Sequence, residues 1–173
     1  MTDKLKNYFV LLKRYSGTFN RGISQDGHCR QEITKGGGLA FFVLLPPYMR
    51  NKKILIADNN DACRESLGVS IKGLGCEVVE AATGPEAIDK ASTMRPNLIM
   101  MDVCLPGMKA DEATLRLKRN LSTQNIPVII TTSWTTVCTV GDRANRALDA
   151  GAEEILYKPF HLTMLRHVLR TYL

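Results

Sequence analysis

The chain has 173 residues, of which 45% are hydrophobic and 23% are charged. This length suits one ordinary domain with an extension, and the composition is that of a globular protein rather than a disordered or fibrous one. The longest strongly apolar run, residues 39–45, is too short to cross a bilayer, so no membrane span is expected.

The net charge is unevenly distributed along the chain. In total, 23 Lys and Arg stand against 17 Asp and Glu, which gives a formal charge of +6 and a pI near 9.2. Residues 1–50 hold eight basic and three acidic residues, whereas residues 51–173 hold fifteen and fourteen. No helix-turn-helix, zinc finger or aromatic stacking platform accompanies the basic segment, so no nucleic-acid partner is expected.

Residues 1–50 are interpreted as a poorly patterned N-terminal extension, with two alternatives left open. One alternative is a basic amphipathic helix for a membrane surface or a partner, because apolar side chains share one helical face at Leu5, Tyr8, Phe9, Leu12 and Tyr15. The other is a mis-assigned start, with the natural start at Met49. Five widely spaced cysteines without a C-x-x-C pair predict reduced thiols and a cytoplasmic protein.

Residues 51–173 alternate short apolar runs with segments of helical periodicity. Strands are expected at residues 54–57, 76–81, 98–101, 127–132 and 154–157. Helices are expected at residues 63–74, 84–94, 110–120, 142–150 and 161–172, the second of them opened by a capping box at Thr83 and Glu86. This rhythm predicts an α/β, flavodoxin-like (βα)5 fold, a doubly wound five-stranded parallel sheet of order 2-1-3-4-5.

Polar residues follow the strands at one edge of this predicted sheet. They are Asp58 and Asn59 after the first strand, Asp102 after the third, Thr132 after the fourth and Lys158 after the fifth. In the order 2-1-3-4-5 the first and third strands flank the point where strand order reverses, so Asp58 and Asp102 face each other there. Two facing acids favour a shared cation, and hard oxygen ligands favour Mg²⁺. A hydroxyl and an ammonium group nearby suggest a site for a phosphoryl group.

Five motifs occur in the order and spacing of a known family. They are KILIADN at 53–59, PNLIMMD at 96–102, LPGM at 105–108, IPVI at 126–129 and GAEEILYKPF at 151–160. Together they resemble the receiver domain of two-component response regulators, and the resemblance covers residues 51–173.

This resemblance implies a role for each matching residue. Asp102 corresponds to the phosphoacceptor, which attacks the phosphohistidine of a histidine kinase or phosphotransfer protein. Asp58, Asp102 and the backbone carbonyl of Cys104 correspond to the ligands of Mg²⁺, with Asn59 as a further candidate. Lys158 corresponds to the lysine that pairs with a phosphoryl oxygen. The resemblance also implies that Thr132 swings inward after phosphorylation and that the bond from Lys158 to Pro159 is cis.

Asn59 departs from the family pattern because receivers usually carry a second acid at this position. The loss of one negative charge predicts weaker Mg²⁺ binding. Asp61 is either a compensating acid or the N-terminal acid of the next helix.

Three further departures lie around the expected site. Lys109 and Ala110 replace the usual Asp-Gly of the turn after the acceptor, and Ile155 stands where many receivers carry a switching aromatic residue. Trp134 lies two residues after Thr132 and is either a loop aromatic or a shield that slows hydrolysis of the aspartyl phosphate.

The resemblance implies a phosphorylatable receiver, and since the chain ends after the last helix we expect it to act as a stand-alone module. The alternative is a pseudo-receiver that binds a partner without phosphorylation. We expect no enzyme acting on diffusible substrates, only a domain that catalyses its own phosphorylation and dephosphorylation. The resemblance also implies, as an alternative to a monomer, a homodimer through the face made by the last two helices and the last strand, residues 142–172.

Overall fold

The structure is a computed structural model that describes residues 49–133 and 137–173, and of residues 137–142 it describes the backbone alone. The predictions for residues 1–48 and for Trp134 lie outside these ranges.

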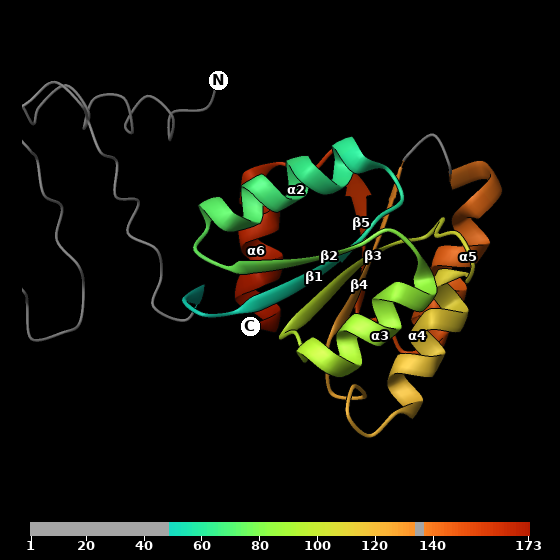
Figure 1. The fold of residues 1–173 in the computed structure, drawn as a ribbon. Helices are drawn as coiled ribbons and strands as arrows, with labels where there is room; N and C mark the ends of the chain where they lie inside the picture. The colour runs from blue at the N-terminus through green and yellow to red at the C-terminus, as the bar shows by residue number, and fades with distance from the viewer. Residues whose placement is uncertain (1–48, 134–136) are drawn as a thin grey trace, which may run out of the picture. The chain divides into compact units, whose positions relative to one another are not determined.

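In the described part of the chain, five parallel strands form one sheet. They are β1 (Lys53–Ala57), β2 (Glu77–Ala81), β3 (Leu98–Asp102), β4 (Val128–Ser133) and β5 (Glu154–Lys158). The strand order is β2-β1-β3-β4-β5, which confirms the predicted topology (Figure 1). The order reverses between β1 and β3, so the carboxyl ends of these two strands flank the switch point.

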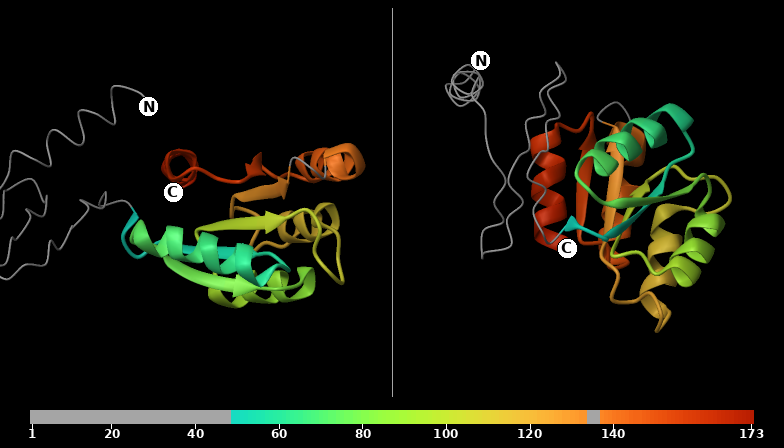
Figure 2. Two further views of the ribbon diagram at one scale, coloured as in Figure 1. Left: turned by 90° about the horizontal axis from the view of Figure 1, so that it is seen from above. Right: turned by 60° about the vertical axis from the view of Figure 1, so that its left-hand side comes forward.

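Helices cover both faces of the sheet (Figure 2). In the described residues they are α2 (Asp61–Gly73), α3 (Gly84–Met94), α4 (Ala110–Arg119), α5 (Val137–Asp149) and α6 (Leu162–Tyr172). The apolar residues of α2 and α6 pack on one face, and those of α3, α4 and α5 pack on the other. None of these helices has the length and hydropathy that crossing a membrane requires.

The continuous apolar runs of the strands follow from this two-sided covering. Successive residues of a strand point to opposite faces. In β1, Leu55 therefore joins the cluster under α3, α4 and α5, while Ile54 and Ile56 join the cluster under α2 and α6. In β3, Met100 and Met101 divide in the same way. This alternation decides on which face each polar residue at a strand end must lie.

Side-chain caps fix the starts of the two helices that follow β1 and β2. The side chain of Asn60 caps α2 by accepting a hydrogen bond from the backbone N–H of Cys63 (3.0 Å), so this helix begins two residues earlier than predicted. The capping box of α3 is present: Thr83 Oγ1 accepts from the N–H of Glu86 (3.3 Å). Its reciprocal bond is shifted by one residue, because the carboxylate of Glu86 accepts from the N–H of Ala82 (2.7 Å).

The start of α5 differs most from the prediction. The helix begins at Val137 rather than at residue 142. Its first turns hold Val137, Thr139, Val140 and Gly141, which are weak helix formers and give little helical signal. The helical signal in the sequence therefore begins at residue 142, five residues after the helix itself.

Two glycines provide a test of how the helices and turns are stabilised. At Gly73, in the last turn of α2, an added Cβ would meet nothing within 4 Å. We expect Gly73→Ala to raise the free energy of unfolding by about 0.5 kcal/mol, because alanine is the better helix former. At Gly151 φ is +105° and a Cβ would lie 3.1 Å from Cγ of Lys118, so Gly151→Ala should be destabilising. Urea denaturation measures both free energies of unfolding. A change in the same direction for the two variants would contradict this prediction.

Candidate functional site

The alternation of the strands brings the predicted charged residues to one face of the sheet. Asp58 follows β1, Asp102 ends β3 and Lys158 ends β5. Counted in steps of two along each strand, all three fall on the positions whose side chains face α2 and α6. The sequence places these residues 44 to 100 positions apart, and the parallel topology places them at the same edge. The structure therefore brings together the two acids and the lysine predicted from the strand ends.

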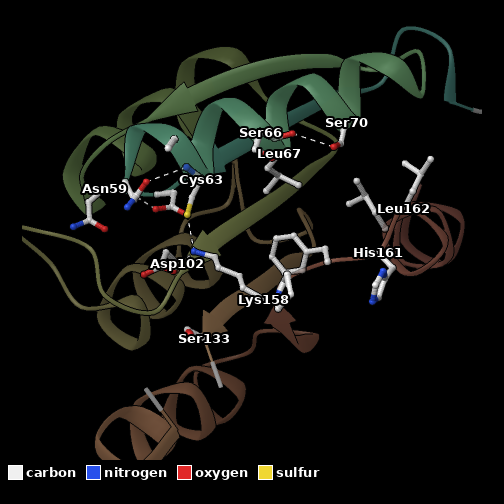
Figure 3. A pocket seen from close by; sticks show the side chains of 16 residues that line it. Asn59, Cys63, Ser66, Leu67, Ser70, Asp102, Ser133, Lys158, His161 and Leu162 are labelled. Atoms are coloured by element: carbon white, nitrogen blue, oxygen red, sulfur yellow. Dashed lines mark hydrogen bonds and ion pairs between the residues drawn. The ribbon is translucent and has the colours of Figure 1, made fainter. Parts of the chain in front are cut away.

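Lys158 bridges the two acids. Its Nζ lies 2.6 Å from Oδ2 of Asp58 and 2.5 Å from Oδ1 of Asp102. The side chains are largely removed from solvent, with exposed fractions of 4% for Asp58, 11% for Asp102 and 18% for Lys158. Figure 3 shows Lys158 reaching from β5 toward Asp102. The peptide bond after this lysine, to Pro159, is cis as the family resemblance implies.

The environment of Lys158 keeps it charged. Burial of the ammonium group lowers the pKa of Lys158, but hydrogen bonds and charges of Asp102 and Asp58 raise it by more. The pKa therefore stands above the ordinary value for lysine, and the bridge is an ionic one at neutral pH.

Backbone N–H groups hold the second oxygen of each acid. Oδ1 of Asp58 accepts from the N–H of Asn60 (2.9 Å), and Oδ2 of Asp102 accepts from the N–H of Cys104 (2.8 Å). Each carboxylate is thus fixed on one side by its own loop and on the other by Lys158. The side chain of Cys104 packs against the core cluster under α3, α4 and α5, so only its backbone belongs to the site.

Arg64 decides the role of Asp61. Its guanidinium donates to Oδ1 of Asp61 (2.6 Å), to the backbone carbonyl of Asp58 (2.8 Å) and to Oε2 of Glu80 (3.3 Å). Asp61 is the first residue of α2, and its side chain is 88% exposed. It is therefore the N-terminal acid of the helix and an ion-pair partner of Arg64, and it does not line the cavity described below.

A cavity of about 640 Å³ opens beside the acids. Asp58, Asn59, Asp102 and Lys158 line one end of it, and the rest extends between α2 and the segment that leads into α6 (Figure 3). Leu67, Phe160, Leu162 and Leu165 make this remainder largely apolar. Asn59 is exposed, so its amide oxygen is open to a ligand in the cavity.

Thr132 lies on the opposite side of β4 from the acids. It is buried and has the parity of the residues that face α3, α4 and α5, and it does not line the cavity. Ser133 does line the cavity, and it is the register partner of Lys158. Sequence reasoning missed Ser133 because it ended the fourth strand one residue early. Strand parity counted from Ile129 is the signal that could have identified it.

The comparisons with known proteins agree with this geometry. A family model for the response regulator receiver domain matches residues 54–170. The chain belongs to this family.

Individual relatives are similar over the same part of the chain. Sporulation initiation phosphotransferase F of Bacillus subtilis is 32% identical over 125 residues, which cover 72% of this chain and 96% of that protein. Phosphate regulon transcriptional regulatory protein PhoB of Pseudomonas aeruginosa is 34% identical over 128 residues, which cover 70% of this chain and 53% of that protein. The chain therefore spans about half the length of this regulator.

A solved receiver domain has the same fold. The receiver domain of sensor histidine kinase PA1611 from Pseudomonas aeruginosa is 27% identical, with a TM-score of 0.64, and the match covers 70% of this chain and 97% of that one. In that structure a magnesium ion is coordinated in the active site cleft.

The remaining departures from the receiver pattern lie around the acid cluster rather than within it. Lys109 is exposed at the start of α4, and its side chain makes no capping bond. Ile155 is partly buried against the core cluster under α3, α4 and α5, the same side of the sheet as Thr132. Position 155 is therefore filled by an aliphatic side chain that packs against the core rather than by an aromatic one.

The burial of the Lys158 bridge predicts a large effect of removing it. Lys158→Met leaves two buried acids facing each other without a counter-charge, so we expect it to lower the free energy of unfolding by about 3 kcal/mol. Arg116→Met is the matched control, because Arg116 also pairs closely with a carboxylate oxygen, that of Glu112 (2.7 Å), but this pair is exposed. Its loss should cost less than about 1 kcal/mol. Equal losses in urea denaturation would show that burial of the bridge does not matter.

Proposed function

We propose that this receiver accepts a phosphoryl group on Asp102 from a phosphohistidine and uses it to switch a protein-interaction surface in a phosphorelay. The observation that carries the proposal is the Lys158 ammonium, which contacts both Asp58 and Asp102 at the switch point of the sheet. A buried nucleophile beside a fixed positive charge is what transfer of a phosphoryl group requires, since the protein mainly positions groups and neutralises charge.

The chain's own residues supply most of the proposed reaction. An oxygen of Asp102 forms the new O–P bond while the N–P bond to the donor imidazole breaks. The N–H of Cys104 orients the carboxylate, and Lys158 compensates the charge on the phosphoryl oxygens. Thr132 must move from the opposite face of β4 to reach that group, which would couple phosphorylation to the packing of α5.

The residues present fit a hard divalent cation. Asp58 and Asp102 hold one ammonium between them, so the cluster keeps a net negative charge, and its donors are oxygens. We propose that Asp58, Asp102 and the carbonyl of Cys104 hold Mg²⁺, with Asn59 as a neutral fourth donor. When bound, Mg²⁺ compensates negative charge on the transferred group.

The cavity beside Asp102 supports a protein partner. Its apolar part lies between α2 and the start of α6, where Leu162 lines the cavity and is 48% exposed. We propose that a histidine kinase or phosphotransfer protein in the cytoplasm approaches here, so that its histidine reaches Asp102. In this proposal the receiver catalyses only its own phosphorylation and dephosphorylation and acts on no diffusible substrate.

Chemical phosphorylation tests the proposed acceptor. Incubation with acetyl phosphate and Mg²⁺ should give one phosphoryl adduct in the intact mass, because the small donor needs no kinase. Asp102→Asn should give none, since the nucleophile is gone. Asp89→Asn, which removes an exposed acid of α3, should behave like the parent. An adduct that survives in Asp102→Asn would refute the assignment.

The alternative is a pseudo-receiver that binds its partner without phosphorylation. One observation favours it: Lys158 contacts both acids, and Asn59 leaves the site one acid short. Absence of an adduct from the parent protein under the conditions above would support this alternative.

The missing acid gives a separate prediction for Mg²⁺ affinity. Asn59→Asp adds a charged oxygen donor at the cavity and should strengthen Mg²⁺ binding about tenfold in isothermal titration calorimetry. Asp61→Asn is the control, because this carboxylate is exposed and engaged by Arg64. It should leave the affinity unchanged. Weaker Mg²⁺ binding in Asp61→Asn would mean that Asp61 does act as the second acid.

A further inference from the structure

The loop between β3 and α4 joins the acceptor to the rest of the fold. It begins directly after Asp102, and the N–H of its second residue, Cys104, holds the carboxylate. Its middle part contains Gly107, at φ +76°, and the buried side chains of Leu105 and Met108. The position of this loop therefore determines how Asp102 and the carbonyl of Cys104 are oriented.

The first turn of α3 packs closely against this loop at two glycines, Gly84 of the helix and Gly107 of the loop. The N–H of Gly84 donates to the carbonyl of Pro106 (3.2 Å). A Cβ on Gly84 would lie 2.7 Å from Cβ of Met108 and 3.0 Å from its carbonyl oxygen. In the reverse direction, a Cβ on Gly107 would lie 3.3 Å from Cδ of Pro85. Each segment thus presents a glycine to a side chain of the other.

The helix side of this contact is held firmly. Its start is fixed by the capping bonds of Thr83 and Glu86, and Lys90 ties the helix to β2 by donating to the backbone carbonyl of Glu80 (2.6 Å). On the other side, Met108 and Ala110 belong to the buried core cluster. Because ordinary contacts of a Cβ are 3.4–4 Å, a methyl group at residue 84 must displace one partner by several tenths of an ångström. Residues 103–109 lie outside any helix or strand, so we expect such a displacement to extend along the loop toward Cys104.

We propose that Gly84 is a positioning residue for the acceptor, acting through the loop from Cys104 to Met108. The absence of a side chain at position 84 allows the loop to approach α3 closely enough for the N–H of Cys104 to hold Asp102. This inference rests on the proposed phosphoryl transfer for its kinetic consequence, but its structural part stands on the contacts alone.

The test compares Gly84→Ala with Ala91→Gly. Both substitutions disturb α3, but Ala91 is a buried residue two turns beyond the place where Gly84 meets the loop, and its loss destabilises the helix. With acetyl phosphate and Mg²⁺, we expect Gly84→Ala to acquire the adduct about tenfold more slowly, because small displacements of reacting groups have large effects on rate. Ala91→Gly should react at the parent rate despite lower stability in urea. Equal rates for the two variants would overturn the proposal.

A relief variant tests the contact itself. Met108→Gly removes the Cβ that lies nearest to position 84, so Gly84→Ala should slow the reaction much less in this background than in the parent. An undiminished effect of Gly84→Ala in the Met108→Gly background would contradict the proposed contact.

Hydrogen exchange of the Cys104 amide separates this inference from the proposed function. The exchange should be faster in Gly84→Ala than in the parent and unchanged in Ala91→Gly, whether or not any protein is phosphorylated. If the parent protein takes up no phosphoryl group, the proposed function fails. The exchange rate of the Cys104 amide then decides by itself whether Gly84 positions the loop. Unchanged exchange in Gly84→Ala would overturn the positioning role.

Discussion

The ionic bridge from Lys158 to Asp58 and Asp102 is the interaction on which the rest of the site depends. In the strand order, β4 lies between β5 and β3, so the lysine side chain must cross β4 to reach either acid. It crosses at Ser133, its register partner, which is a small residue on the same face. The bridge therefore requires a long cationic side chain on the outer strand and a short one on the strand between. One ammonium group then joins the carboxyl ends of three strands that are distant in sequence.

Two loops align the acids with this bridge, and each loop is held from outside the site. The corner after β1 is held by Arg64, whose guanidinium contacts the carbonyl of Asp58 and also β2 through Glu80. The loop after β3 is held by the close approach of α3 at Gly84. The geometry of the acids thus depends on Arg64, Glu80 and Gly84, which do not line the cavity.

The sequence was sufficient for the fold and for the charged core of the site because both follow from periodicity. Continuous apolar runs identified the strands, and the polar residue that ends each run identified Asp58, Asp102 and Lys158. The position of Ser133 needed the exact end of β4, and an error of one residue reverses the face on which a side chain lies. The fate of Asp61 depended on whether Arg64 turns toward it, and the role of Gly84 depends on a loop packing against a helix. Neither is visible from periodicity, because tertiary contacts decide both.

The charge balance of the site explains why a single lysine can serve both as a structural bridge and in the proposed reaction. Two carboxylates and one ammonium leave a formal charge of −1, and the family's second acid would make it −2. Phosphorylation of Asp102 would replace one carboxylate charge with about −1.5 to −2 on the phosphoryl group. The ammonium of Lys158 would then be drawn toward the new group and away from Asp58, because the stronger charge lies on the acceptor side. With a neutral amide at Asn59, Asp58 is the one other acid of the cluster described here, so it is the residue that Lys158 would leave and that the proposed Mg²⁺ would then hold.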